Sequence, residues 1–326
     1  EEVQVFAAEP PTVAATAFSG LSNETPMYVR TKSLTAYKED AIWRSLFSDI
    51  SSRFVEFTLT ACPSNLTVRG DSGKVKSNTF WVVDWDAYES SGVPSKVGLG
   101  EQALPAHTYA LSGNHTLRIE GAVTYIGCDE PTIDGVSYPY EESGDTIVPN
   151  GESSFSGYSF LTLKNNGTIL DGESHLLTRV SRSDRSVLSE VGPSAFLRNK
   201  RLSAVYLAGI SKIGAASFAY DTAIDNLALL DVVGEIDKFA FYGCSGLSSV
   251  TSLNGKPDID GIYGFTIADY AFGEIPHLTY IQVGVPLADN AKITNLSFGE
   301  FDSPEAQNAV YVYVPLEAVK SYTENA

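Results

Sequence analysis

The sequence has little cysteine. Three cysteines occur among its 326 residues, Cys62, Cys128 and Cys244, and no two of them form a C-x-x-C motif. An odd number of cysteines without such spacing disfavours both a disulfide-stapled scaffold and a structural zinc site. We therefore expect three small buried hydrophobic side chains, because free cysteine is among the most buried residue types. The alternative is a single bridge between Cys62 and Cys128.

Positive charge is also scarce. Lysine and arginine number 22 against 40 aspartates and glutamates, which gives a net charge of −18 at pH 7 and a pI of about 4.5. Such a chain repels phosphate backbones and anionic lipid surfaces, so we expect no nucleic-acid partner. The longest apolar runs, such as Leu227–Val233, fall far short of the roughly 20 residues that a membrane-spanning helix needs. We therefore expect no transmembrane segment.

Methionine occurs once, at Met27, and the chain opens on Glu1 and Glu2. A chain without an initiator residue suggests a mature product whose leader has been removed, which fits export from the cell. A piece cut at a domain boundary would look the same.

The residues that most enzymes need are few and unpatterned. Only four histidines occur, His107, His115, His175 and His277, and none has the H-E-x-x-H spacing of a metalloprotease. The sequence has no G-x-S-x-G nucleophile motif, no glycine-rich phosphate loop and no dinucleotide fingerprint. We therefore expect no enzymatic activity, no cofactor and no metal ion.

The sequence does contain a repeated phrase: isoleucine or valine, three variable residues, alanine or serine, then phenylalanine. Its phenylalanines lie 22, 23, 31 and 26 residues apart, which is the period of leucine-rich repeats with two copies lengthened. A unit of this length cannot bury its apolar face alone, so the units must stack around one continuous core. The five copies are Val191–Phe196, Ile213–Phe218, Ile236–Phe241, Ile267–Phe272 and Ile293–Phe298.

A second phrase follows most copies and has the alternating apolar residues of a short strand. The long spacing comes from Ser252–Thr266, whose glycine and proline content predicts a loop projecting from one unit. We expect the outward positions of the strands to form an exposed face. The strand phrases are Leu202–Leu207, Ile224–Leu229, Leu247–Ser252 and Leu278–Val283.

The first 50 residues contain the same pattern. Val13–Phe18 is a sixth copy of the phenylalanine phrase, and Met27–Glu39 matches the end of the chain at Val312–Glu324. The apolar residues of Asp40–Ile50 have helical spacing. We expect two terminators that cap stacks of repeats, one within residues 1–50 and one at the C-terminus. Alternatively, the N-terminal copy docks onto the later repeats as part of one continuous body.

Ile213–Leu229, Ile236–Val250 and the terminator Val312–Tyr322 resemble the BspA-type leucine-rich repeats of bacterial cell-surface proteins, and residues 1–50 resemble the terminal repeat and cap of that family. The resemblance implies a mainly β solenoid with short helices over residues 1–50 and 176–326. It also implies a Bacteroides-like source, export followed by a lipid anchor in the outer membrane or secretion, and adhesion to host matrix proteins or neighbouring cells. The family brings no catalytic residues with it.

Between these parts the pattern changes. Residues 51–127 contain short alternating strands separated by glycine, serine, asparagine and proline, which is typical of a small all-β sandwich. Phe80–Asp86 and His107–Gly121 resemble a PKD-type immunoglobulin-like domain, although Trp85–Gly92 replaces the W-G-D-G turn of that family. We expect residues 128–175 to form an irregular acidic excursion rich in tyrosine, glycine and serine, and residues 176–326 to form the solenoid and its C-terminal cap.

The excursion contains a cluster of aromatic residues, Tyr138, Tyr140, Phe155 and Tyr158. One hypothesis is a surface that contacts a sugar or a protein, because tyrosine is enriched at contact surfaces. The other is a loop held down by its own aromatic side chains.

Tyrosines also recur at the outward positions of the strands. Tyr206, Tyr280, Gln282, Tyr311 and Tyr313 form our candidate ligand face, because tyrosine often dominates binding energy; the competing explanation is that tyrosine is a good strand former. We hypothesise a monomeric, non-catalytic extracellular adhesion protein of a bacterial cell surface, which binds host extracellular-matrix or cell-surface proteins, or glycans, through its repeats. The alternative is a structural scaffold or a carbohydrate-binding accessory protein of the bacterial envelope.

Overall fold

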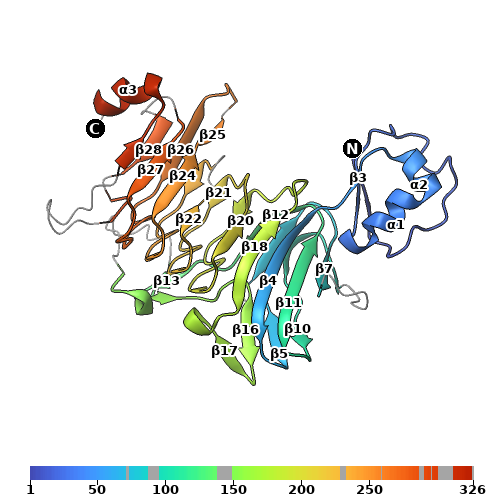
Figure 1. The fold of residues 1–326 in the computed structure, drawn as a ribbon, viewed down its shortest axis with the longest axis horizontal. Helices are drawn as coiled ribbons and strands as arrows, with labels where there is room; N and C mark the ends of the chain where they lie inside the picture. The colour runs from blue at the N-terminus through green and yellow to red at the C-terminus, as the bar shows by residue number, and fades with distance from the viewer. Residues whose placement is uncertain are drawn as a thin grey trace.

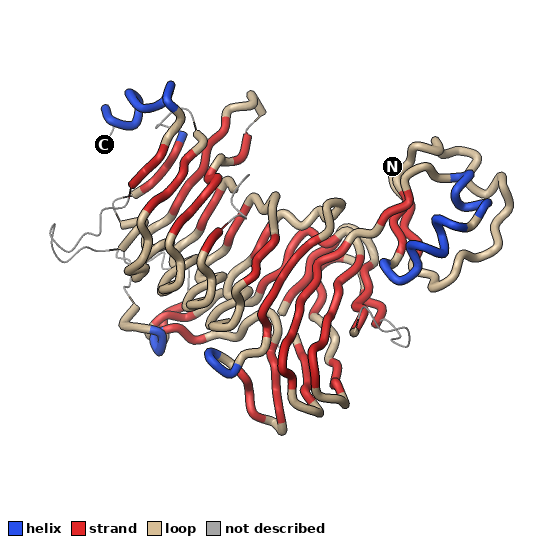
Figure 2. The backbone as a smooth tube through the Cα atoms, viewed as in Figure 1, coloured by secondary structure: helices blue, strands red, loops and turns tan. Residues whose placement is uncertain are grey.

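The computed structural model describes residues 1–70, 73–86, 95–137, 149–227, 233–257, 259–285, 290–294, 296–299 and 311–324. Within these ranges the chain is mainly β with three short α-helices, which confirms the expected class at this coarse level. The helices are α1 (Leu34–Glu39), α2 (Ala41–Leu46) and α3 (Val319–Glu324). Figure 1 shows an elongated molecule with α1 and α2 at one end and α3 at the other, and Figure 2 shows the helical segments at the periphery of the strands.

The phenylalanine phrase forms one ladder of parallel strands. The first apolar residues of successive phrases are register partners, in the order Val191, Ile213, Ile236, Ile267 and Ile293. Each copy of the phrase therefore supplies one strand, and the copies lie side by side. These strands are β19 (Glu190–Val191), β21 (Lys212–Ile213), β23 (Glu235–Ile236), β26 (Tyr263–Ile267) and β28 (Ala291–Ile293).

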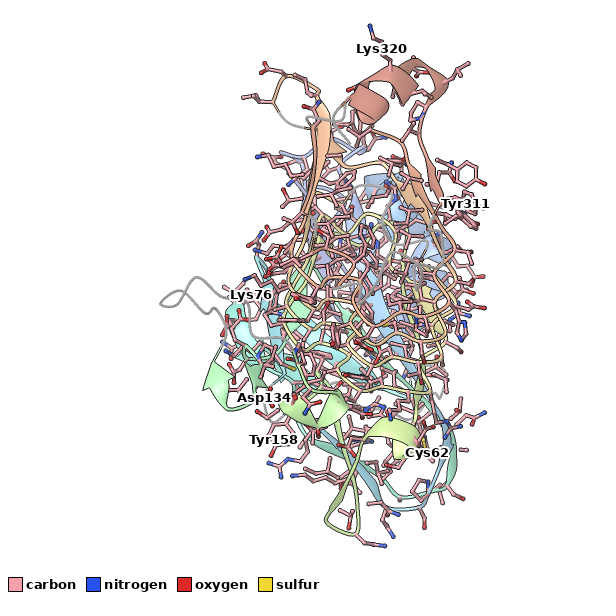
Figure 3. All side chains as sticks on the ribbon, turned by 90° about the vertical axis from the view of Figure 1, so that its left-hand side faces the viewer. Cys62, Lys76, Asp134, Tyr158, Tyr311 and Lys320 are labelled. Atoms are coloured by element: carbon pink, nitrogen blue, oxygen red, sulfur yellow. The ribbon has the colours of Figure 1, made fainter. Side chains whose placement is uncertain are left out.

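The second phrase forms another parallel ladder, in which Leu227, Val250, Ile281 and Val312 are successive register partners. Figure 3, which looks along the stack from its C-terminal end, shows the two ladders on opposite sides of the packed side chains. One coil of the chain thus contributes one strand to each ladder. The strands of the second ladder are β22 (Asn226–Leu227), β24 (Ser249–Leu253), β27 (Tyr280–Val283) and β29 (Tyr311–Tyr313).

A column of phenylalanines fills the space between the ladders. The phrase phenylalanines, from Phe196 to Phe298, stack with neighbouring ring centroids 5.0, 5.2, 5.1 and 5.7 Å apart. Beside the rings, the N–H of Phe218 donates to the carbonyl of Ala240 in the next coil at 2.8 Å, and the N–H of Phe241 donates to Ala271 at 2.7 Å. The phrase needs alanine or serine here because a larger buried side chain would force the hydrogen-bonded backbones apart.

Strands from residues 51–127 extend the first ladder and form a separate sheet with the strands of the first coil. β12 (Val123–Gly127) pairs in parallel with β19, and β4 (Phe54–Cys62) pairs antiparallel with β18 (Leu177–Arg182), which itself pairs with β20 (Ala204–Tyr206). One hydrophobic cluster runs through the whole region, from Val55 to Val285. The structure therefore differs from the expected self-contained immunoglobulin-like sandwich ending at residue 127. Alternation identifies strands in a sequence, but it does not say which strands pair.

The remaining strands complete these sheets. β18 and β4 belong to a six-stranded sheet of order β20-β18-β4-β11-β7-β8, and β12 continues the first ladder into β6 and β9. The other strands of these sheets are β11 (Gly113–Glu120), β7 (Trp81–Trp85), β8 (Ser95–Val97), β6 (Lys74–Ser77) and β9 (Gly100–Ala103).

Residues 128–175 contain regular strands, in contrast to the expected irregular excursion. A four-stranded sheet has the order β10 (His107–Tyr109), β5 (Leu66–Arg69), β16 (Thr162–Asn165) and β17 (Thr168–Leu170), and a small sheet has the order β14 (Val136–Ser137), β13 (Thr132–Ile133) and β15 (Phe155–Ser156). The same segment contains two 3-10 turns, η2 (Glu152–Ser154) before β15 and η3 (Gly172–Ser174) after β17. Strand pairing with the distant β5 organises this segment, and local sequence gives no sign of that partner.

Two further expectations can be compared with the structure. The three cysteines are buried and free, as expected, and the alternative bridge between Cys62 and Cys128 is not formed. The insertion Ser252–Thr266, expected as a loop, includes β25 (Lys256–Pro257), which pairs antiparallel with the start of β26.

Residues 1–51 form a small unit with its own core. β1 (Val3–Val5), β2 (Met27–Val29) and β3 (Ile50–Ser51) make a parallel sheet. The 3-10 turn η1 (Thr31–Ser33) leads into α1, and the Asp40 carboxylate caps α2 by accepting from the N–H groups of Ile42 and Trp43. Trp43 packs against Phe18 and Tyr37, so the phenylalanine of the sixth phrase copy again lies in a core.

Polar contacts attach this N-terminal unit to β7 and β11, and Asp49 also forms an ion pair at 3.0 Å with Arg185, which lies between β18 and β19. Arg30 donates to the Asp84 carboxylate at 2.9 Å, and Lys32 lies 2.9 Å from the other Asp84 oxygen. The N–H of Thr31 donates to Glu120 at 2.8 Å. Both carboxylates are buried, and burial raises the pKa of Glu120. The unit therefore contacts strands of residues 51–127 and, through Arg185, the segment that precedes the first copy of the phenylalanine phrase.

We expect Phe241→Ala to lower the free energy of unfolding by about 3–5 kcal/mol, because it leaves a cavity in the middle of the phenylalanine column. Phe80→Ala is the matched control, since the Phe80 side chain is 59% exposed and its loss opens no cavity. Urea denaturation followed by fluorescence measures both variants. Equal losses would contradict the assignment of the column as core.

We expect Asp84→Ala to loosen the N-terminal unit, because it leaves the buried Arg30 guanidinium without its closest counter-ion, at a cost of about 3–5 kcal/mol. Hydrogen exchange of residues 1–51 should accelerate, which measures opening of this unit directly. The control is Glu235→Ala, which breaks the exposed pair with Lys212 and should cost below about 1 kcal/mol. Unchanged exchange in Asp84→Ala would show that the ion pairs do not hold the unit.

Candidate functional site

Four of the five candidate residues lie together on the second ladder. Tyr280 and Gln282 on β27 are the register partners of Tyr311 and Tyr313 on β29. Ile281 and Val283, which alternate with them, are buried, so the candidate side chains point away from the core. Tyr311 is 63% and Tyr313 59% exposed, and Figure 3 shows Tyr311 on the outer surface of the stack.

The tyrosines of this cluster contact one another. The Tyr280 and Tyr313 rings meet edge to face with centroids 5.8 Å apart, which is a favourable aromatic arrangement. Tyr280 is half-buried beneath its neighbours. The contact forms an aromatic ridge on the surface of the ladder.

The fifth candidate, Tyr206, lies elsewhere. It is on β20, which belongs to the six-stranded sheet, and β22 and β24 lie between β20 and β27 (Figure 1). Tyr206 instead lies under the Arg179 guanidinium, 4.7 Å from its ring centroid, and borders a separate hollow of about 460 Å³ with Arg182 and Asp184.

The strand face around the tyrosine cluster carries no charge. No residue within β22, β24, β27 or β29 is charged, although the protein has a net charge of −18. The opposite ladder differs, because its central outward row contains Glu190, Lys212 and Glu235 as register partners. Depletion of charge with enrichment of tyrosine is the composition of a protein-contacting surface.

The histidines in the described part of the chain are engaged in packing or hydrogen bonds, with the exception of the exposed His277. His107 stacks on Trp85 at 4.6 Å, and the two ring nitrogens of His115 lie 2.9 Å from Asp86 Oδ1 and 3.0 Å from the Leu111 carbonyl. His175 is buried and donates from Nε2 to the Leu161 carbonyl. This aromatic arrangement around Trp85 could not be predicted from local sequence, because its members come from three different strands.

The cysteines are not activated as nucleophiles. Burial raises the pKa of Cys62 to about 11, and burial also raises the pKa values of Cys128 and Cys244. Each thiol is therefore protonated at neutral pH. Within the described ranges no cluster of three histidine, cysteine, aspartate or glutamate side chains has the geometry to hold a metal ion.

The aromatic cluster expected in residues 128–175 separates into two kinds of residue. Phe155 is buried in a second hydrophobic cluster with Phe239 and Tyr242, so it serves packing. Tyr158 is 49% exposed and is labelled in Figure 3 near the lower edge of the molecule. Tyr138 and Tyr140 lie outside the described residues.

The chain matches no protein-family model. A search among curated proteins finds no significant match, and neither does a search among solved structures. Among the described residues, no helix combines the length and apolar character that crossing a bilayer requires.

We expect His175 to make stability depend on pH. Burial lowers its pKa from 6.5 to about 4, so the unfolded chain binds one more proton than the folded chain between these values. The stabilisation is fully present above pH 6.5 and is lost as pH falls towards 4, by roughly 3 kcal/mol.

His175→Gln should remove this part of the pH dependence, because glutamine does not titrate. Chemical denaturation of wild type and variant from pH 4 to pH 7.5 measures the difference. His277→Gln, which replaces an exposed histidine, is the matched control. Parallel profiles for wild type and His175→Gln would show that His175 does not titrate differently on folding.

Proposed function

We propose that this protein is a non-catalytic binding protein of a bacterial cell surface, and that its stacked coils are a BspA-type leucine-rich-repeat solenoid. The sequence resemblance supports this reading, and the pairing of one strand per phrase in each of two parallel ladders is what such a solenoid requires. In this reading, the strands of residues 51–127 close the N-terminal end of the solenoid core, and β29 with α3 closes the C-terminal end.

The binding site that we propose is the uncharged strand face centred on Tyr280, Gln282, Tyr311 and Tyr313. The observation that carries the proposal is a charge-free, tyrosine-rich face on a strongly acidic protein. A partner that covers this face need not desolvate a charged group, and the tyrosines supply contact area with few rotatable bonds. Parallel strands also give the face a length that suits a macromolecule better than a small ligand.

The partner class that we propose is an extracellular-matrix or cell-surface protein of a host, with the chain exported and acting as a monomer. The absence of nearby positive charge on these strands argues against recognition of phosphate or sulfate groups, which need arginine or lysine. We keep a scaffold or carbohydrate-binding role in the bacterial envelope as the alternative.

We expect the combined variant Tyr280→Ser, Tyr311→Ser and Tyr313→Ser to lose binding to immobilised extracellular-matrix proteins by at least tenfold, as removal of interface hot spots does. Surface plasmon resonance against a panel of such proteins measures it. Tyr206→Ser is the matched control, because it removes an exposed strand tyrosine outside the cluster. Circular dichroism should show that both variants keep the wild-type fold.

The outcomes separate the hypotheses. Loss of binding in the triple variant alone supports the proposed face. Equal loss in Tyr206→Ser would shift the site towards β20, and unchanged binding in the triple variant would remove the face from consideration. A wild-type protein that binds no matrix or cell-surface protein would favour the scaffold alternative.

A further inference from the structure

A small pocket lies away from the strand face, where the β16–β17 hairpin meets the first coil of the repeats. Its volume is about 120 Å³, and its wall includes Tyr158, Thr162, Ile169, Asp171, His175 and Arg198. Figure 3 shows Tyr158 at the opposite end of the view from Tyr311. The pocket is therefore a different surface from the proposed protein-binding face, and the inference drawn from it does not depend on that proposal.

The wall of the pocket is held rigidly by buried polar groups. Arg198 donates to the carbonyls of Phe155 at 3.4 Å and of Gly157 at 3.0 Å, which fixes the segment that carries Tyr158. His175 uses both ring nitrogens, donating to the Leu161 carbonyl and accepting from the N–H of Leu177. Such support from side chains behind the surface preorganises a binding site.

Three polar groups in the wall, on Thr162, Asp171 and Arg198, have no hydrogen-bond or ion-pair partner among the described residues, and for Arg198 this group is Nε. The Thr162 residue is only 3% exposed, and its Oγ1 is buried with no hydrogen-bond partner among the described residues. Asp171 is exposed, and no ion pair or side-chain hydrogen bond joins its carboxylate to the described part of the chain. An unsatisfied buried hydroxyl costs about 1–3 kcal/mol, so a ligand group that pairs with it gains an interaction that water reaches poorly.

Apolar surface accompanies these groups. Tyr158 is 49% and Ile169 37% exposed at the rim. An aromatic ring and an aliphatic side chain suit a ligand with a C–H face, while Thr162 and Asp171 suit hydroxyl groups at its edge. That combination of an apolar face and edge hydroxyls is the chemistry of a sugar ring.

We propose that this pocket binds the terminal neutral monosaccharide of a glycan. A neutral sugar fits because its hydroxyls can donate to the Asp171 carboxylate, whereas an anionic sugar would be repelled by it. Two of the Arg198 nitrogens already donate to carbonyls, so the guanidinium offers a ligand only its Nε N–H. A purely apolar ligand would desolvate Thr162 and Asp171 without compensation. The volume is below the roughly 300 Å³ of pockets that enclose a drug-sized ligand, so one ring end enters and the rest of the chain stays outside.

The test titrates the whole protein with the methyl glycosides of glucose, galactose, mannose and N-acetylglucosamine, with glucuronic acid as the anionic probe. Saturation-transfer NMR detects binding, and titration of chemical shifts gives the dissociation constant. We expect one or more neutral glycosides to bind and glucuronic acid not to bind. A disaccharide that ends in the responding sugar should bind at least as tightly as the monosaccharide, which distinguishes a chain end from a free sugar.

Three variants locate the site. Thr162→Val, Asp171→Asn and Tyr158→Ala should each weaken binding of the responding glycoside by fivefold or more. Thr168→Val is the matched control, since Thr168 lies on the neighbouring β17 with its side chain exposed outside the pocket, and it should leave the constant unchanged. Absence of binding by every neutral glycoside, preference for glucuronic acid, or equal constants in wild type and the three variants would overturn the proposal.

Thermal unfolding gives a second readout that needs no ligand. Thr162→Val keeps the shape of the side chain and removes the hydroxyl, so it should leave the melting temperature unchanged or raise it if Oγ1 lacks a partner within the protein. A clear fall in the melting temperature would show that the hydroxyl is satisfied internally, which removes the basis of the proposal.

Discussion

In the stack, the N–H of the phenylalanine that ends one copy of the phrase donates a hydrogen bond to the carbonyl of the alanine or serine in the next copy. These hydrogen bonds set the spacing of the whole stack. They hold neighbouring coils at strand distance, as between Phe218 and Ala240 or Phe241 and Ala271, and this distance also places the phenylalanine rings about 5 Å apart. This arrangement has a cost in conformational free energy. Non-glycine residues two positions before the phenylalanines, such as Ala216 and Tyr270, have φ of 51° and 57°, a left-handed conformation that costs roughly 1–2 kcal/mol per residue. Packing of the column and the bonds between coils must outweigh it.

This spacing determines which residues fit inside each coil, so only the outward-facing side chains of the strands can vary. These outward-facing side chains differ in chemistry between the two ladders. One presents Glu190, Lys212 and Glu235 in a row, where opposite charges neutralise one another locally, as in the 3.3 Å contact between Lys212 and Glu235. The other presents Tyr280 and Tyr311 as register partners. A charged row keeps a sheet surface solvated and discourages association, whereas an uncharged aromatic row does not. This difference is the reason that we propose the uncharged ladder, and not the charged one, as the binding face.

The sequence predicted what depends on local pattern. The phrase fixed the register of the first ladder, since its apolar first residue recurs as the partner from Val191 to Ile293. The separation of Tyr206 from Tyr280 could also be predicted, because the phrase that contains Tyr206 lies three copies before that of Tyr280 and the two intervening copies have no tyrosine. The pairing of β4 with β18 and of β12 with β19 could not be predicted from the sequence, because any strand with one apolar face could pair with the edge of β18 or β19. Nor does sequence show that Thr162 and Asp171 border one pocket, since that depends on how the β16–β17 hairpin folds back.

The regular stacking of the coils determines the shape of the surfaces that this molecule can offer to a ligand. Stacked coils of equal length offer a continuous face with little depth, so they favour a partner that is large and flat. Depth arises where the repeat is interrupted: the pocket beside Tyr158 lies between a hairpin from the inserted segment and the coil at Leu197 and Arg198. At such a junction, backbone hydrogen bonds between coils no longer determine the position of every residue. Polar side chains such as Arg198 and His175 instead donate hydrogen bonds to backbone carbonyls. A protein built this way can present an extended protein-contacting face and a small sugar-sized pocket without either constraining the other, because the first depends on the outward rows and the second on the interruption.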